Sequence, residues 1–99
     1  MYNIRVTARP GRRDDLLALF HELAVAAVDE PGTLVYTFST ADSDPDLVVT
    51  FELFADEAAV EAHKAAAAMQ RVRPQLDEVV ASLDAKVGRY AFGPGVPTA

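Results

Sequence analysis

Polar and apolar residues alternate over residues 2–8, so that tyrosine, isoleucine, valine and alanine fall on one side and asparagine, arginine and threonine on the other. This alternation predicts a β-strand with one apolar face. After Pro10–Gly11 the period changes, and apolar residues recur every three or four positions from 16 to 28. That spacing predicts an amphipathic helix, which Pro31–Gly32 ends.

Two further strands are predicted after this helix. Residues 33–40 are rich in β-branched and aromatic residues, and residues 47–54 are almost wholly apolar. The polar segment 41–45, ADSDP, predicts a turn between them. Both sides of these strands carry apolar residues, whereas an antiparallel sheet with one wet face alternates apolar and polar positions. We therefore expect a second copy of the chain to cover the face that its own helices leave free.

The remaining part of the chain predicts helical structure followed by a last strand. Asp56 is placed to cap a helix that runs through His63 into a run of alanines. Apolar residues continue at helical spacing from 69 to 83, and Pro74 is expected to kink or restart the helix. Residues 84–91 are predicted to form the last strand.

The predicted order of elements is β-α-β-β-α-β, the split βαβ or ferredoxin-like plan. The fold class is therefore α+β, with helices over one face of a four-stranded antiparallel sheet. The 99 residues contain no internal repeat and no linker long enough to divide domains. We expect residues 1–92 to form one domain and residues 93–99 to form a flexible C-terminal tail.

Charge and composition argue against several classes of function. A net charge of −6 disfavours nucleic acid and anionic membrane surfaces as partners, because both are bound through cationic patches. The absence of cysteine removes disulfides, thiolate metal sites and a cysteine nucleophile. The first residues lack the apolar segment of a signal peptide, and no apolar run approaches the ~20 residues of a membrane span. These observations predict a cytoplasmic protein.

The motifs of common cofactor and nucleophile sites are absent from the sequence. His21 and His63 are far apart and, without cysteine, form no ligand set of normal spacing. No glycine-rich turn joins a strand to a helix, and no G-x-S-x-G elbow occurs. We expect neither a metal nor a cofactor, so that any catalysis would be acid–base work or substrate-driven oxygen chemistry in an apolar cavity.

His63 is the strongest candidate for a functional residue. It lies three positions after Val60 and therefore on the same helix face, and the aromatic Phe54 ends the preceding strand. One titratable group in an apolar wall is typical of a small-molecule pocket. The same pattern also fits a half-buried histidine without any chemistry.

Glu52 has both a functional and a structural interpretation. It alternates with Phe54 and shares its face of the strand, where a buried carboxylate is costly unless it is paired or can titrate. In a pocket it would contact the substrate. The structural alternative is an ion pair with Arg5 or Arg89 from another strand.

The other polar candidates carry weaker signals. Tyr36 and Tyr90 either line a pocket or pack in the core, which is the usual place of strand tyrosines. Arg71 and Arg73 either meet an acidic substrate or are solvated at the surface. Asp29–Glu30 is interpreted as solvated surface charge.

Several segments, in the right order, resemble the antibiotic-biosynthesis monooxygenase (ABM) family. They are PG after the first strand, EPGTLVY at Glu30–Tyr36, DPDLVVTFELFADEAAVEAHK at Asp44–Lys64, and the short final strand. The resemblance covers residues 2–92 and implies a ferredoxin-like protomer, a dimeric α+β barrel and a small apolar pocket between sheet and helices. Characterised members of this family include cofactor-independent oxygenases of phenols, quinols and polyketide intermediates, haem-degrading oxygenases, and isomerases of a phosphorylated signalling sugar.

The chain departs from the family pattern at three places. Phe54 stands where the family usually has tryptophan, so that an indole N–H donor is lost. Ala68 and Met69 stand at the end of the family pattern AHLxSPHF, which removes the second histidine. Ile4 stands where the haem-degrading branch has asparagine, and residues 69–83 contain no histidine to ligate iron. Haem degradation is therefore disfavoured.

The resemblance and the candidate residues together predict a cofactor-independent monooxygenase acting on a phenol, hydroquinone or polyketide-like substrate, with His63 as the catalytic residue, either a base or a hydrogen-bond partner. The residues expected to line the substrate pocket are Tyr36, Glu52, Phe54, Val60, Met69 and Tyr90. One alternative is an isomerase of a phosphorylated signalling sugar, with Lys64 or Arg73 holding the phosphate. The other is a non-catalytic, dimeric binding or accessory protein.

Overall fold

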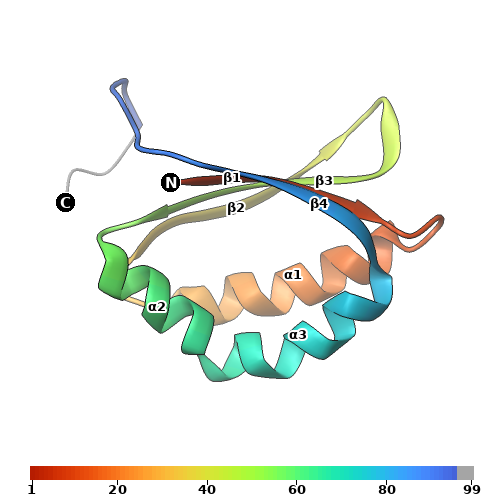
Figure 1. The fold of residues 1–99 in the computed structure, drawn as a ribbon, viewed down its shortest axis with the longest axis horizontal. Helices are drawn as coiled ribbons and strands as arrows, with labels where there is room; N and C mark the ends of the chain where they lie inside the picture. Colours follow the sequence, from red (N-terminus) through yellow and green to blue (C-terminus); the bar gives the residue numbers. More distant parts are fainter. Residues whose placement is uncertain (96–99) are drawn as a thin grey trace.

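The predicted succession of strands and helices is present in the computed structural model, which describes residues 1–95 (Figure 1). The strands are β1 (Tyr2–Ala8), β2 (Thr33–Ala41), β3 (Asp44–Phe54) and β4 (Val80–Val87). The helices are α1 (Arg13–Ala27), α2 (Glu57–Ala65) and α3 (Ala67–Val79). The strands form one antiparallel sheet in the order β2-β3-β1-β4, and all three helices lie on one side of it. The predicted α+β, ferredoxin-like fold is confirmed.

Strand register decides which side chains of the sheet meet the helices. Tyr2 of β1 pairs with Glu52 of β3, and Glu52 also pairs with Tyr36 of β2. Directly paired residues point to the same face of a sheet, so these three side chains share the helix-facing side. Thr50, two residues earlier in β3, lies on that side as well.

Two strands begin earlier than the sequence pattern predicted. β3 begins at Asp44, because the hairpin from β2 turns within residues 42–43 rather than over residues 41–45. β4 begins at Val80, directly after α3, whereas helical spacing had predicted helix through residue 83. Leu83 fits either period, because it lies three residues after Val80, as in a helix, and alternates with Ala85 and Val87, as in a strand. When residues 80–87 are extended, their backbone pairs with the edge of β1. Because buried backbone N–H and C=O groups need hydrogen-bond partners, this segment forms a strand and not a further turn of helix.

The helices differ from the prediction at Ala66, which separates α2 from α3. Its φ of −60° and ψ of 146° are extended, so the alanine run is not one continuous helix. The beginning of α2 is as predicted, because Asp56 Oδ1 accepts a hydrogen bond of 2.8 Å from the backbone N–H of Ala59. Pro74 lies inside α3 without ending it.

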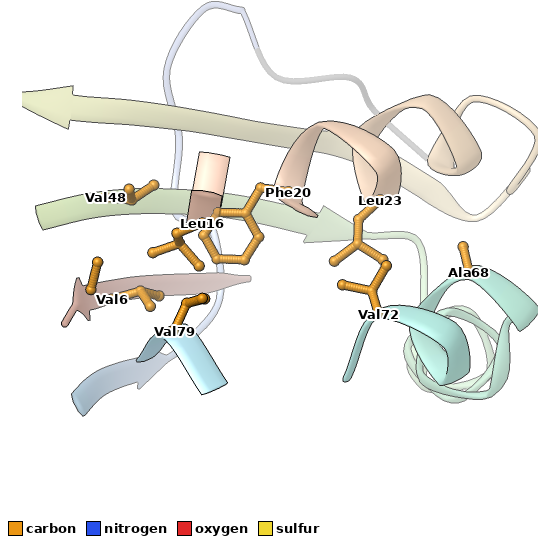
Figure 2. Close-up of a cluster of buried hydrophobic side chains, with 9 residues drawn as sticks. Val6, Leu16, Phe20, Leu23, Val48, Ala68, Val72 and Val79 are labelled. Carbon is orange, nitrogen blue, oxygen red and sulfur yellow. The ribbon is translucent and has the colours of Figure 1, made fainter. Parts of the chain in front are cut away.

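The hydrophobic core lies between the sheet, α1 and α3 (Figure 2). Its buried members include Val6 and Val48 from the sheet, Leu16, Phe20 and Leu23 from α1, and Ala68, Val72 and Val79 from α3. Phe20 also stacks on Phe38 of β2, with ring centroids 4.6 Å apart. The buried residues of α2, Val60 and His63, lie outside this cluster. Burial of α2 therefore depends on a different region between helix and sheet.

No helix of residues 1–95 covers the face of the sheet opposite α1, α2 and α3, which we call the open face (Figure 1). Val35, Val49 and Phe51 lie on that face and are half-buried. Within the same described residues, none of the helices has both the length and the apolar character that crossing a membrane requires. The predicted tail begins at residue 93, and its residues 96–99 lie outside the described part of the chain.

Candidate functional site

A cavity of about 400 Å³ lies between the helix-facing side of the sheet and the three helices. Most of its wall is apolar, and its apolar side chains include Ile4, Val6, Phe20, Leu23, Phe38 and Leu76. The polar side chains on the sheet and α2 are Tyr2, Tyr36, Thr50, Glu52, His63 and Lys64. A cavity of this size and composition fits a small organic molecule with one or two polar groups.

His63 occupies the place in this cavity that its spacing from Val60 predicted. The residue is 5 % exposed, and its imidazole lies between α2 and the sheet rather than in solvent. The ring centroid of His63 is 4.8 Å from that of Tyr36 and 5.2 Å from that of Phe54. The imidazole is therefore held between two aromatic rings that also line the cavity.

Glu30 fixes the orientation of this imidazole. His63 Nδ1 lies 2.7 Å from Glu30 Oε1, and the hydroxyl of Thr33 donates to the same oxygen at 2.8 Å. An ionised carboxylate only accepts hydrogen bonds, so Nδ1 carries the proton of the neutral imidazole. Nε2 is then the nitrogen with a free lone pair.

The interpretation of Glu30 as solvated surface charge is wrong. Its side chain is only 18 % exposed and accepts the hydrogen bond from Nδ1–H of His63. Glu30 lies in the connection between α1 and β2, and 33 positions separate it from His63. No local spacing links two such positions. The local sequence feature is the threonine three residues later, Thr33. Its hydroxyl donates a hydrogen bond to Glu30 and holds the carboxylate near the start of β2.

Glu52 faces His63 from the sheet side of the cavity. The hydroxyl of Thr50 donates a hydrogen bond of 3.1 Å to Glu52 Oε2. Burial raises the pKa of Glu52 above its ordinary value, although the hydrogen bond from Thr50 and the charge of His63 act in the opposite direction. The neutral carboxylic acid is therefore favoured here over a wider pH range than at the surface.

The alternative of an ion pair between Glu52 and Arg5 or Arg89 is wrong for the part of the chain described. Arg5 pairs with Val49 in the sheet and is exposed on the opposite face from Glu52. Arg89 follows the end of β4 and is exposed. Among residues 1–95, the hydrogen-bonding partner of the Glu52 carboxylate is the hydroxyl of Thr50.

Tyr36 is a phenol within the cavity wall. Its pKa is raised strongly, first by burial and then by the negative charges of Glu52 and Glu30. Tyr36 therefore stays neutral at physiological pH, and its ring packs edge-on against both His63 and Phe38.

The remaining predicted pocket residues divide into two groups. Phe54, Val60 and Met69 line the cavity together with His63. Tyr90 does not line it, because β4 ends at Val87 and Tyr90 lies beyond the sheet. The prediction placed Tyr90 on the last strand, which begins and ends about four residues earlier than expected.

Charged residues from the helices complete the cavity wall. Lys64 of α2 and Arg73 and Asp77 of α3 line it and are exposed on their outer sides. Arg71 was the other arginine considered for an acidic substrate. Its Nε instead lies 3.7 Å from Oε2 of Glu22 in α1. Within residues 1–95, no three histidine, cysteine, aspartate or glutamate side chains are grouped so that they could hold a metal ion.

Three solved structures resemble this chain over most of its length. A protein from Bacteroides thetaiotaomicron, described as a candidate antibiotic biosynthesis monooxygenase, is 25% identical with a TM-score of 0.84, over 99% of this chain and 93% of that one. Protein SO0527 of Shewanella oneidensis is 26% identical with a TM-score of 0.79, over 86% and 84%. Protein PA3566 of Pseudomonas aeruginosa is 23% identical with a TM-score of 0.82, over 91% and 92%, a likeness of fold.

Family membership follows from the match of the sequence to a family model rather than from these structures alone. No curated protein matches the chain. The model of the family described as antibiotic biosynthesis monooxygenase matches residues 1–75, which include β1 to β3, α2, His63 and the Glu30 contact. The chain therefore belongs to the antibiotic biosynthesis monooxygenase family.

Proposed function

We propose that this protein is a monooxygenase that binds a phenol, a hydroquinone or a polyketide-like aromatic in its cavity and uses no bound cofactor. The observation that carries the proposal is the Glu30–His63 pair in the wall of an apolar cavity. The family of the chain and the name of the Bacteroides relative support the monooxygenase class. The flat rings of Tyr36 and Phe54 beside the imidazole support an aromatic substrate.

In this proposal His63 is the base. Glu30 holds Nδ1–H, so Nε2 accepts a proton from a hydroxyl or an acidic C–H of the substrate. The positive charge that forms on the imidazole then lies beside the Glu30 carboxylate, which stabilises it as the aspartate does in a serine–histidine–aspartate arrangement. The substrate becomes an electron-rich anion in a cavity with a mostly apolar wall.

Oxygen chemistry follows from that anion. It gives one electron to O2, and the resulting substrate radical and superoxide combine in a C–O bond at a ring carbon, forming a hydroperoxide after protonation. Loss of water converts that carbon to a carbonyl. For a hydroquinone, the sum is hydroquinone plus O2 giving hydroxyquinone plus water. The substrate supplies all the electrons, so no external reductant is consumed.

Oxygen uptake with a panel of hydroquinones and anthrones tests this function. We expect O2 to be consumed in equimolar ratio to the oxygenated product. His63→Ala should lower turnover roughly a hundred- to ten-thousand-fold, the range expected for loss of a general base. His21→Gln is the matched control, because His21 is exposed on α1 and should leave turnover unchanged. A wild-type protein that consumes no oxygen with any member of the panel contradicts the proposal.

A second candidate function is favoured by Lys64 and Arg73, two cations that line the same cavity. In an isomerase of a phosphorylated sugar, they would hold the phosphate while His63 moves a proton between neighbouring carbons. Loss of carbon-bound deuterium from a phosphoketose, without oxygen uptake, would favour the isomerase over the oxygenase. Ligand binding without turnover of either kind would indicate a binding protein.

A further inference from the structure

We infer that Glu52 is a second catalytic residue, the acid that gives a proton to the departing hydroxide when the substrate hydroperoxide loses water. This inference rests on the proposed oxygenase function and goes beyond it, because that function requires only the base His63. It concerns the later half of the reaction, after oxygen has bonded to the substrate.

The position of Glu52 supports this role. It pairs across the sheet with Tyr36, and Phe54 lies two residues further along the same face of β3. The rings of these two residues are the ones that contact His63. A substrate lying against both rings therefore has the imidazole on the α2 side and the Glu52 carboxyl on the sheet side. An acid and a base on different sides of one molecule are suited to opposite proton transfers.

The surroundings of Glu52 leave it able to donate a proton. Thr50 donates its hydroxyl hydrogen to Oε2, so Oε1 is the oxygen available to carry the acidic proton. Thr50 lowers the pKa of the carboxyl through its hydrogen bond, and His63 from α2 and the N-terminal amino group preceding β1 lower it through their charges. Burial outweighs these and raises the pKa of Glu52, which keeps the acid form present at higher pH than for a surface glutamate.

The proposed step is balanced within the site. His63 takes the remaining hydrogen from the carbon that carries the hydroperoxide, and the C–H electron pair becomes the second bond of a carbonyl. The O–O bond breaks, and hydroxide leaves with the electron pair of that bond. Glu52 protonates it, which gives water. His63 then carries one proton more and Glu52 one proton fewer, and transfer of that proton through solvent restores both groups.

The test is a single-turnover reaction with a dihydroxyanthrone in air-saturated buffer. Oxygen uptake is followed with an electrode, and hydroperoxide is measured in quenched samples with a peroxide reagent. In Glu52→Gln the shape and the hydrogen bond from Thr50 are kept, but the acidic proton is lost. We expect oxygen uptake near the wild-type rate, a carbonyl product formed about a hundredfold more slowly, and hydroperoxide that accumulates. Glu52→Asp should recover part of the product rate.

Glu57→Gln is the matched control, since Glu57 is exposed in the first turn of α2, and it should behave like the wild-type protein. Equal product rates in Glu52→Gln and wild type, with no hydroperoxide in either, would overturn the inference about Glu52 while the oxygenase function stands. Absence of oxygen uptake by the wild-type protein would overturn both. A loss of oxygen uptake in Glu52→Gln as large as in His63→Ala would also overturn it, because Glu52 would then act before the O–O bond breaks.

Discussion

Gly32 packs so closely against Ala59 that a Cβ at position 32 would overlap with the Ala59 methyl group. Gly32 precedes β2 and lies two residues after Glu30, whereas Ala59 lies one helical turn before His63 in α2. The contact therefore sets the distance between the loop that carries the carboxylate and the helix that carries the imidazole. We therefore expect the 2.7 Å separation of Glu30 Oε1 and His63 Nδ1 to depend on this contact.

We expect Gly32→Ala to destabilise the protein by about 1–3 kcal/mol, the usual cost of forcing an extra methyl group into a packed contact. It should also lower turnover, because α2 must move away from the Glu30 loop. Chemical denaturation and oxygen uptake measure the two effects. Gly88→Ala is the control, since a Cβ there meets only ordinary contact with the Met1 side chain. If Gly32→Ala were as stable and as active as Gly88→Ala, the contact would not position the pair.

Glu30→Gln should reduce kcat by about tenfold or more with little change in KM. The amide oxygen can still accept the hydrogen bond from Nδ1–H, but it carries no charge to stabilise the protonated imidazole. Steady-state kinetics with the best substrate of the panel measures both constants. Asp29→Asn removes the exposed neighbouring charge and should leave kcat as it is. A Glu30→Gln protein with wild-type kcat would limit Glu30 to a structural role.

Phe54→Ala distinguishes a pocket wall from ordinary core. The ring contacts Tyr2 and His63 at centroid distances of 5.8 and 5.2 Å and lines the cavity. We expect affinity for an aromatic ligand to fall about tenfold or more. The loss of unfolding free energy should stay below the ~3 kcal/mol typical of a buried phenylalanine. Phe92→Ala, at an exposed position, is the control for both titration and denaturation. A large stability loss with unchanged affinity would assign Phe54 to the core alone.

The raised pKa of Glu52 predicts how stability changes with pH. Below the ordinary pKa of glutamate, the folded and unfolded chains both hold the proton. Between the ordinary and the raised pKa, only the folded chain keeps it, so stability falls as pH rises through this window. Glu52→Gln removes that loss. Denaturation of both proteins across this pH range should show the variant gaining stability relative to wild type, and a constant difference would contradict the burial effect.

We propose that a second copy of the chain covers the open face of the sheet. Val35, Val49 and Phe51 are half-buried there without any helix from residues 1–95 above them. Sedimentation at micromolar concentration should show a dimer. A stable dimer interface should bury at least about 1,200 Å² of surface in total. Phe51→Lys should shift the protein to monomer, whereas Ala18→Lys, on the exposed side of α1, should not. A wild-type protein that sediments as a monomer would contradict this proposal.

The fold was predictable because most elements have one dominant period. β1 alternates, α1 has its apolar stripe, and Asp56 marks the start of α2. Prediction failed where one segment fitted two periods, as at the junction of α3 and β4. There the choice between helix and strand depends on pairing with β1, a strand more than seventy residues away in the sequence.

The candidate site was predictable in part for the same reason. His63 and Phe54 could be placed because each lies on a defined face of a regular element. Glu30 could not, since it lies in a connection and its partner is brought near by the fold as a whole. The hydrogen-bond partner of Glu52 was also missed. The prediction considered only oppositely charged residues on other strands, whereas the partner is Thr50, a neutral residue two positions earlier in the same strand.

The ionisation of Tyr36 contrasts with the ionisation that we propose for a phenolic substrate in the same cavity. Burial and the carboxylates of Glu52 and Glu30 disfavour the phenolate of Tyr36, and its hydroxyl remains protonated. A neutral phenol gives up an electron to oxygen far less readily than a phenolate does. In the proposed mechanism, a substrate hydroxyl that reaches Nε2 of His63 would be ionised, while the phenol of Tyr36 is held in its neutral, less reactive form. If the protein is the oxygenase that we propose, the arrangement that activates its substrate would therefore also protect Tyr36 from oxidation.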